Sequence, residues 1–227
     1  MFSGASNFVN STDTTFFFIV AVSVFFLVVI TASMIYFVIR YSRKRNPRAK
    51  NIHGNIPLEV TWTVIPTILV LIMFWMGWSG YKQLANAPSD AMNIDVTAQM
   101  WRWTFKYPNG VTADSLFVPV NKPVKVLLHS RDVNHSFFVP AFRVKKDVIP
   151  NRNNSAWFIA DKVGIYDLFC AEYCGLNHSH MLSKVVVMPQ NNFDNWLNKK
   201  ALQDSLKSVP APVKDSTAAK PDTTKAM

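Results

Sequence analysis

Two long apolar stretches near the N-terminus dominate the pattern of hydrophobic and polar positions. Thr15–Ile39 contains no charged residue, and Leu58–Tyr81 contains only Glu59, near one end. At about 1.5 Å of rise per residue, helices of these lengths cross the roughly 30 Å hydrocarbon core of a bilayer. We therefore predict a transmembrane helical hairpin over residues 15–81, with spans at 15–39 and 58–81 and a loop at 40–57. Two buried helices of a soluble protein are the weaker alternative at these lengths.

The residues between the two spans predict the orientation of the hairpin. Arg40–Lys50 carries six basic residues and no acid, and the positive-inside rule places such a loop on the cytoplasmic side. Trp75, Trp78 and Tyr81 form an aromatic belt at the opposite end of the second span. An N-terminal segment at residues 1–14 and the long C-terminal part are then expected on the outer face.

The C-terminal part has the pattern of a β domain followed by a polar tail. Short runs rich in β-branched and aromatic residues alternate with turn signals, as expected for a sandwich or barrel. The predicted strands are Ile94–Ala98, Trp103–Tyr107, Val124–His129, Ser136–Val139, Ala156–Ala160, Ile165–Phe169 and Ser183–Met188. A short amphipathic helix is predicted at Asn192–Gln203, within a domain that spans residues 82–204. Residues 205–227 are rich in Ser, Pro, Ala, Lys and Thr and are predicted to be disordered.

The distribution of basic residues indicates which class of binding partner to expect. The formal net charge is +10, but the basic residues are spread out except in the loop between the spans. That placement favours membrane orientation over nucleic-acid binding. Between residues 93 and 200 there are eight acidic and thirteen basic side chains, so the outer domain is basic as well.

A cluster of metal-binding residue types follows the predicted strand at 165–169. The only two cysteines are Cys170 and Cys174, and His178 and Met181 follow four and seven residues after the second. Thiolate, imidazole and thioether together suit copper, whereas a thioether is a poor ligand for zinc. A disulfide is the other alternative, but so small a loop would stabilise little and would leave the histidine and the methionine unexplained.

This cluster and four other segments resemble subunit II of the cytochrome c oxidases of the haem–copper superfamily. The other segments are Glu59–Pro66, Gln99–Trp103, Ser130–Phe137 and Arg143–Pro150. The resemblance extends from the first span to about Gln203, and it implies a cupredoxin-like sandwich, a Greek-key barrel, beside the hairpin. It also implies a dinuclear copper centre called CuA. One departure is Asn151, where the family commonly has glycine.

The resemblance assigns the copper ligands residue by residue. It implies that Cys170 and Cys174 supply two bridging thiolates and that His135 and His178 supply two terminal imidazoles. Met181 is implied to supply a thioether, and Glu172 a backbone carbonyl. The Glu172 carboxylate is also implied to bind a magnesium ion at the interface with the haem-bearing subunit I, since Mg²⁺ favours carboxylate oxygens.

Other residues have a functional and a structural interpretation. By resemblance, Trp101 is the surface tryptophan through which the donor passes its electron; a core aromatic is the alternative. Glu59 is implied to lie at the mouth of a proton path into subunit I, and the alternative is a snorkelling acid at a helix end. His180, His129 and His53 are expected to be bystanders.

The function that the resemblance implies is that of a subunit of a proton-pumping terminal oxidase. It would accept electrons from cytochrome c, or from a small cupredoxin, and pass them to haem in subunit I, where O2 is reduced to water. Subunit III is a further expected partner, and the expected location is a bacterial inner membrane with the CuA domain on the periplasmic face. A CuA subunit of a nitric oxide reductase and a membrane-tethered copper carrier are the alternatives. The basic outer domain predicts a weakly charge-steered donor.

Overall fold

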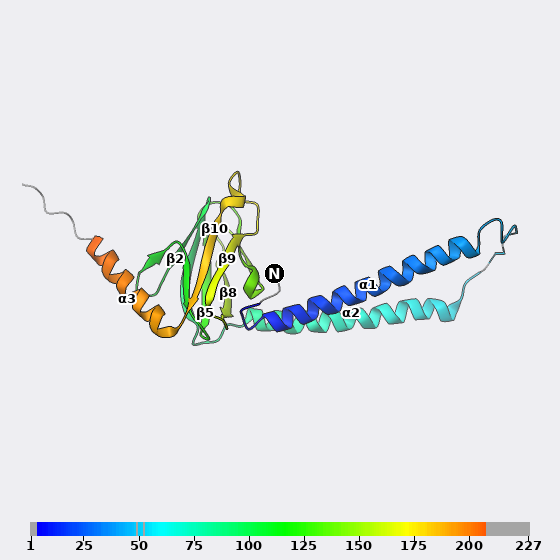
Figure 1. Ribbon diagram of the computed structural model, residues 1–227, viewed down its shortest axis with the longest axis horizontal. Helices are drawn as coiled ribbons and strands as arrows, with labels where there is room; N and C mark the ends of the chain where they lie inside the picture. Colours follow the sequence, from blue (N-terminus) through cyan, green and yellow to red (C-terminus); the bar gives the residue numbers. More distant parts are fainter. Residues whose placement is uncertain (1–3, 49, 52, 208–227) are drawn as a thin grey trace, which may run out of the picture.

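The computed structural model describes residues 4–48, 50–51 and 53–207, and it combines a helical hairpin with a β-sandwich. Helices α1 (Val9–Arg40) and α2 (Ile56–Ala85) run side by side and project from one end of the sandwich (Figure 1). Helix α3 (Gln190–Lys207) lies at the other end of the molecule. Residues 205–207, predicted as disordered, continue α3 instead, and the remainder of that predicted tail lies outside the described residues.

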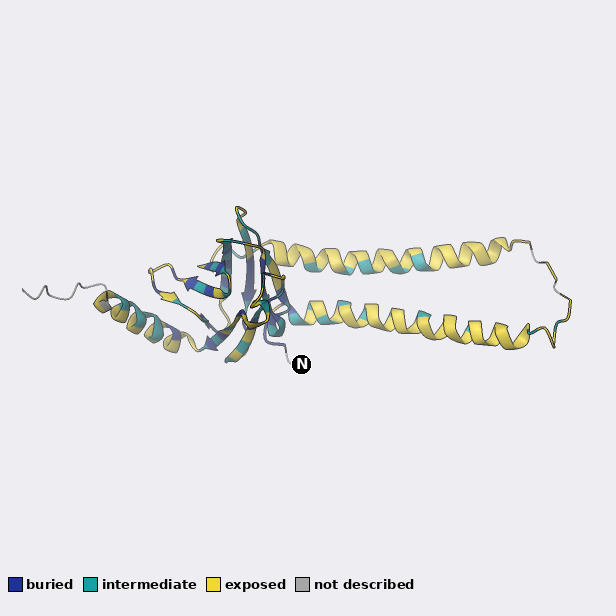
Figure 2. Ribbon diagram, turned by 90° about the horizontal axis from the view of Figure 1, so that it is seen from above, coloured by how far each residue is buried: buried dark blue, intermediate teal, exposed yellow. Residues whose placement is uncertain are grey.

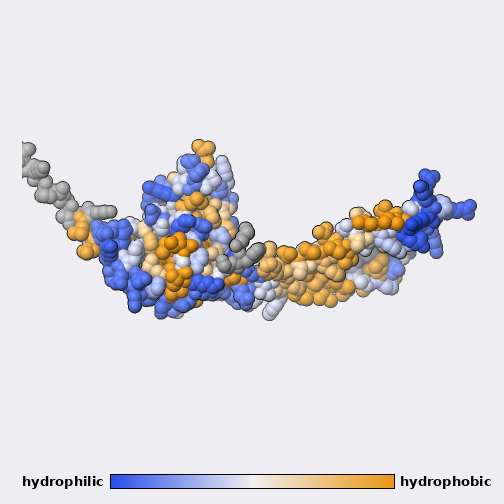
Figure 3. Space-filling model, in the orientation of Figure 1, coloured by the Kyte–Doolittle hydropathy of each residue, from blue (hydrophilic) through white to orange (hydrophobic). Residues whose placement is uncertain are grey.

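The surface of the hairpin is suited to a bilayer. Neither α1 nor α2, both described throughout, contains a buried residue (Figure 2). Their surface is apolar over most of its length and becomes hydrophilic at the loop that joins them (Figure 3). Exposing this surface to water would cost a free energy of roughly 25 cal/mol for each Å² of apolar area. The two helices therefore have the length and the surface of membrane spans.

The start of α2 is fixed by local hydrogen bonds. Asn55 caps the helix, because its Oδ1 accepts the Leu58 backbone N–H at 3.1 Å. Glu59 Oε1 in turn accepts the backbone N–H of Asn55 at 3.2 Å. These bonds begin α2 two residues before the predicted span, and Pro66 lies inside the helix.

The outer domain consists of two five-stranded sheets packed face to face. One sheet has the order β3-β2-β1-β5-β8 and the other β4-β10-β9-β6-β7. The β1–β5 and β4–β10 pairs are parallel, and the remaining pairs are antiparallel. The strands are β1 Met92–Gln99, β2 Arg102–Lys106, β3 Thr112–Ala113, β4 Leu116–Pro119, β5 Pro123–Ser130, β6 His135–Val139, β7 Val144–Val148, β8 Asn154–Ile159, β9 Gly164–Cys170 and β10 Leu182–Met188.

The core is formed by side chains that alternate along each strand between buried and exposed positions. Along β5, Val124, Val126 and Leu128 are fully buried while the residues between them are partly exposed. A period of two places one set of side chains between the sheets and the other set outside. All seven predicted strands are present, and the sandwich is confirmed. Strands β3, β4 and β7 were not predicted. The sequence of β7, Val-Lys-Lys-Asp-Val, is mostly polar.

The turn before β8 contains Asn151, the residue that stands where the resemblance leads us to expect glycine. Asn151 has φ of 57°, in the left-handed region that glycine adopts most easily. Asparagine tolerates this region better than most residues because its short polar side chain bonds locally. The substitution therefore keeps the backbone turn.

The segment before α1 is part of the outer domain. Ala5 and Phe8 are buried, and the Ala5 backbone N–H donates to Ala141 O at 2.9 Å. The Ser6 hydroxyl donates to Phe142 O at 2.7 Å, and Ser6 forms a bridge with Ala160 at the edge of β8. Within the predicted 1–14 segment, residues 5–8 thus pack as part of the sandwich, and the chain is helical from Val9.

The start of α1 and the end of α2 are both hydrogen-bonded to the sandwich. At the α1 end, Arg143 donates two hydrogen bonds to the Asp13 carboxylate, at 2.7 and 3.0 Å. At the α2 end, Trp157 Nε1 donates to Gln83 O at 3.0 Å. The Trp157 ring also meets Phe8 edge-on, with centroids 4.9 Å apart. These contacts fix the position of the outer domain relative to the hairpin.

Candidate metal centre

The predicted cluster occupies the loop between β9 and β10. Strand β9 ends at Cys170, and β10 begins at Leu182, directly after Met181. The Cys170 backbone N–H donates to Met181 O at 3.3 Å, which closes the base of the loop. Sheet pairing brings the distant His135 to the same place, because β6 pairs with β9 and Phe137 lies opposite Cys170.

Five donor side chains and one carbonyl lie close together in the structure. Cys170 Sγ is 3.8 Å from Cys174 Sγ, far beyond the roughly 2.05 Å of a disulfide, so both cysteines are free thiols. Each sulfur has its own imidazole, with His135 Nδ1 3.8 Å from Cys170 Sγ and His178 Nδ1 3.4 Å from Cys174 Sγ. Met181 Sδ lies 3.8 Å from Cys174 Sγ, and the Glu172 backbone oxygen lies 3.3 Å from Cys170 Sγ.

A carboxylate orients the buried imidazole. Asp132 Oδ1 lies 2.8 Å from His135 Nε2, which leaves Nδ1 directed at the sulfur. Partial burial raises the pKa of Asp132, but bonds from the Met100 N–H, from His135 and from the Val133 N–H outweigh it, so the pKa is lowered. Sequence reasoning missed Asp132, although an acid three residues before a ligand-type histidine is a usable signal.

The site is shielded from water. His135 and Met181 are fully buried, and Cys170 and Cys174 are nearly so. Burial, followed by the neighbouring Cys170 sulfur, raises the pKa of the Cys174 thiol to about 12. A thiol in such surroundings is held protonated until a cation replaces the proton.

Trp101 lies against the loop. It is half-buried, and its Nε1 donates to the backbone oxygen of Cys174 at 3.2 Å. Gly175 has φ of 111°, and a Cβ there would lie 3.4 Å from Trp101 Cζ2. The backbone conformation therefore favours glycine at this position, and a Cβ there would be in ordinary van der Waals contact with the indole. Sequence reasoning did not single out Gly175.

Other predicted residues lie away from the sulfurs. The side chain of Glu172 is exposed on the loop, and His180 is exposed with its Nδ1 3.2 Å from Ser179 Oγ. His129 lies 3.8 Å from Asp95, which agrees with a partnered surface histidine. Glu59 is at the start of α2, at the far end of the hairpin from the sandwich (Figure 1).

The donor set fits copper better than zinc. Two thiols, two imidazoles, a thioether and a carbonyl converge, and the thioether favours copper. Each sulfur lies nearest a different imidazole, an arrangement that would let each of two copper ions take one imidazole. The residues therefore fit the dinuclear group that the resemblance implies.

Comparison with known proteins agrees with this arrangement. Residues 3–76 match the transmembrane domain of cytochrome C oxidase subunit II, and residues 111–188 match its periplasmic domain. Cytochrome c oxidase subunit 2 of Thermostichus vulcanus is 30% identical, over 81% of this chain and 73% of that protein. This chain belongs to the cytochrome c oxidase subunit II family. It is therefore a membrane protein with an extramembrane domain.

Two further comparisons show how much of each similar protein's length this chain covers. Cytochrome c oxidase subunit 2 of Alkalihalophilus pseudofirmus is 36% identical over 79% of this chain but only 56% of its own length. The chain thus spans little more than half of that relative. The crystal structure of the periplasmic domain of subunit II of cytochrome oxidase from Bradyrhizobium japonicum has 30% identity and a TM-score of 0.50, covering 52% of this chain and 99% of that domain. Family membership favours the oxidase over the nitric oxide reductase and the copper carrier.

Proposed function

We propose that this chain is the electron-accepting subunit of a proton-pumping cytochrome c oxidase. It takes electrons from cytochrome c at a CuA centre on the outer domain and delivers them to haem in subunit I, where O2 is reduced to water. Membership of the subunit II family supports this proposal, and so does a hairpin with the surface of membrane spans.

The observation that carries the proposal is the pairing of sulfurs and imidazoles. The two sulfurs lie 3.8 Å apart, and each has one histidine Nδ1 within 3.8 Å. With Met181 and the Glu172 carbonyl, this gives six donor groups and leaves no donor unused. Two copper ions bound there would accept and release one electron at a time.

The residues of the chain have distinct roles in this proposal. Cys170 and Cys174 would hold the two ions through their thiolates, and His135 and His178 would each supply one imidazole. The sheets hold these side chains so that they move little when the charge of the site changes, which favours rapid electron transfer. Asp132 orients His135, and burial excludes water and competing ligands.

Trp101 is proposed to receive the electron from the donor. It is partly exposed, and it is joined by one hydrogen bond to the backbone of Cys174. The path from the protein surface to a bridging sulfur is therefore short. The domain carries more basic than acidic residues, so we expect apolar contact to contribute much of the donor's docking.

Subunits I and III are the proposed partners within the oxidase. The loop that carries the sulfurs exposes Glu172, Tyr173 and Leu176, and the last is 87% exposed. An apolar side chain this exposed favours burial against another subunit. The Glu172 carboxylate is available there for the proposed magnesium ion. We propose that this face lies on the periplasmic side of a bacterial inner membrane.

Electron spin resonance of the purified full-length chain, loaded with copper, tests the proposal. One unpaired electron shared by two copper nuclei gives a seven-line hyperfine pattern, while one copper gives four lines. Cys170→Ser or Cys174→Ser should abolish the shared signal, because a hydroxyl cannot replace a bridging thiolate for soft ions. His180→Ala is the matched control and should leave the spectrum unchanged. A four-line spectrum, or a colourless zinc protein, would overturn the assignment.

A further inference from the structure

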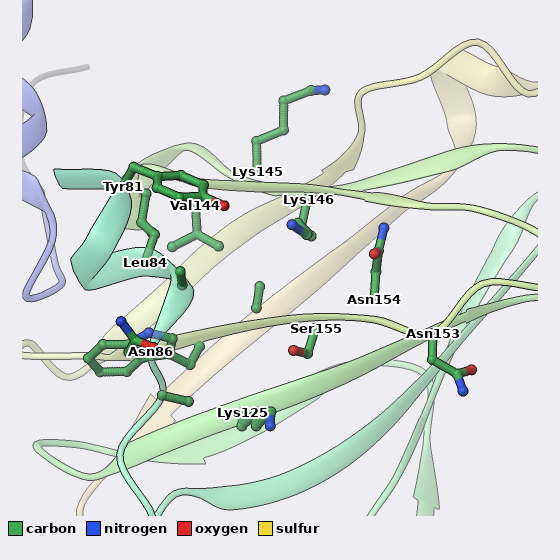
Figure 4. Close-up of a pocket in the computed structure, with 14 residues that line it drawn as sticks. Tyr81, Leu84, Asn86, Lys125, Val144, Lys145, Lys146, Asn153, Asn154 and Ser155 are labelled. Carbon is green, nitrogen blue, oxygen red and sulfur yellow. The ribbon is translucent and has the colours of Figure 1, made fainter. Parts of the chain in front are cut away.

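A cavity of about 650 Å³ lies where the end of α2 meets the sandwich, away from the sulfur cluster (Figure 4). Its walls come from the last turn of α2, from β7 and β8, and from one residue of β5. Tyr81 and Leu84 line the helix side, and lysines and amides line the sheet side. Nothing in the proposed electron transfer uses this cavity.

The sheet side of the cavity is cationic. Lys125, Lys145 and Lys146 all line it. Lys145 pairs with Asp147 at 3.0 Å, so one carboxylate offsets one of the three positive charges. The pKa of Asp147 is lowered, first by the bond from Lys145 and then by that from Ser136, so this acid stays ionised. The wall therefore keeps a net positive charge.

Neutral hydrogen-bond donors surround the lysines. Asn86, Asn153, Asn154 and Ser155 line the same cavity, and all but Asn154 are exposed. Asn154 already donates to the backbone oxygen of Asp147 at 2.7 Å, which fixes its position. Amide and hydroxyl groups beside lysines are the groups that bind phosphodiester and glycerol oxygens.

The helix side of the cavity is apolar and continues onto the hairpin. Tyr81 and Leu84 are 61% and 41% exposed, and Trp75 and Trp78 lie further along the same helix at 69% and 44%. Lys82 Nζ lies 5.5 Å from the Trp78 ring centroid. Aromatic and basic residues at the end of a span mark the depth of the lipid headgroups. The cavity therefore opens at the headgroup layer, with apolar surface leading into the bilayer.

We propose that this cavity binds the headgroup of an anionic phospholipid. The phosphate would lie against Lys125 and Lys146, and the acyl chains would follow the exposed face of α2 past Tyr81 and Trp78. A free phosphate ion would leave the apolar side unused, and a neutral lipid would leave the positive charge unbalanced. An anionic lipid matches both sides at this depth. The lipid would also span the contact between hairpin and sandwich, beside Trp157 and Gln83.

Native mass spectrometry of the full-length chain in detergent tests the proposal. The chain is incubated with equal amounts of phosphatidylglycerol and phosphatidylethanolamine that carry the same acyl chains, and the bound lipids are counted. We expect preferential retention of phosphatidylglycerol. The triple variant Lys125→Gln, Lys145→Gln and Lys146→Gln should reduce that preference at least about tenfold, since lysines near a lipid surface attract anionic headgroups.

The control removes three lysines from the opposite end of the domain. Lys106→Gln, Lys199→Gln and Lys200→Gln lower the net charge equally, and they lie on β2 and α3 (Figure 1). Equal retention by the two triple variants would overturn the proposal, because the preference would then reflect net charge alone. Inorganic phosphate is the second probe. If it displaces phosphatidylglycerol at low millimolar concentration, the site is a phosphate site and the lipid proposal fails.

A cross-linking arm distinguishes lipid from protein. A photoreactive phenylalanine analogue is placed at Tyr81 in the assembled oxidase and irradiated in its native membrane. Capture of phospholipid supports the proposal. Capture of another subunit at this position would show that protein covers the cavity and would overturn it. Failure of the copper experiment would leave these results unaffected, because the two sites share no residue.

Discussion

The indole Nε1 of Trp101 donates a hydrogen bond to the backbone oxygen of Cys174, 3.2 Å away. A partly exposed aromatic ring is thereby joined to the residue that carries one of the two clustered sulfurs. The next residue, Gly175, lies against the same ring and has φ of 111°, a conformation that glycine adopts most easily. The loop and the tryptophan thus constrain each other.

Replacing Trp101 with phenylalanine should slow electron uptake while leaving the copper spectrum intact. The smaller ring loses the hydrogen bond to Cys174, although no proposed copper ligand changes. We expect reduction by a reduced donor to slow by about tenfold or more, which corresponds to roughly 1.4 kcal/mol of activation free energy. Stopped-flow spectroscopy measures this rate. Trp196→Phe, on α3 beside Phe117 and Tyr107, is the control. Unchanged uptake by the Trp101 variant at normal donor affinity would make Trp101 a packing residue.

Replacing Asp132 with asparagine should weaken copper binding without unfolding the domain. An amide can no longer stabilise the imidazole as a carboxylate does, and loss of such an outer partner typically costs ten- to a hundredfold in metal affinity. Competition with a chelator of known affinity measures the change. Asp167→Asn, in an exposed ion pair with Lys184, removes the same charge from the surface and should have little effect. Equal affinities for both variants would show that Asp132 does not position His135.

Replacing Phe8 with alanine should loosen the sandwich from the hairpin. Phe8 is 2% exposed and packs edge-on against Trp157. Removing a buried aromatic ring costs about 3–5 kcal/mol, so amide hydrogen exchange along β8 should accelerate. Phe16→Ala removes the same side chain from the exposed surface of α1, where it is 55% exposed. Exchange in β8 should not change in that variant, and acceleration in both would mean that the effect is not local.

Two substitutions at Glu59 separate its structural role from a proton role. Glutamine keeps an oxygen for the Asn55 N–H but has no charge, whereas alanine loses both. If Glu59 supplies protons, both variants should slow oxidase turnover equally, with copper signal and electron uptake unchanged. If it only caps α2, the glutamine variant should turn over like the parent. Turnover of the assembled complex across pH decides between these outcomes.

Local sequence predicted most of the fold and those residues of the metal centre that are close to one another in the chain. Apolar length predicted the hairpin, and alternation predicted strands such as β5. The cluster from Cys170 to Met181 was recognisable because its members are close in sequence. The position of His135 beside them follows only from the pairing of β6 with β9, and its role was inferred from resemblance rather than from pattern.

The parts that sequence missed depend on long-range contacts. Residues 5–8 have no periodicity of their own, and they are ordered by hydrogen bonds to residues 141, 142 and 159. Strand β7 carries Lys145 and Lys146 in its centre, so its pattern resembles a loop. The same two lysines, with Lys125, form the cationic side of the cavity. No local rule connects them to the end of α2.

The segment just before α1 completes a sheet edge that is encoded 152 positions later, since Asn7 Oδ1 accepts the backbone N–H of Ile159. This sets an order for biogenesis. Residues 5–8 and β8 have to be on the same side of the membrane before β8 has its full set of partners, so the placement of the segment before α1 precedes maturation of the outer domain. A chain held with residues 5–8 on the other side from the sandwich would present β8 and the Trp157 ring uncovered. Such a chain would be recognisable to a protease before any metal is delivered.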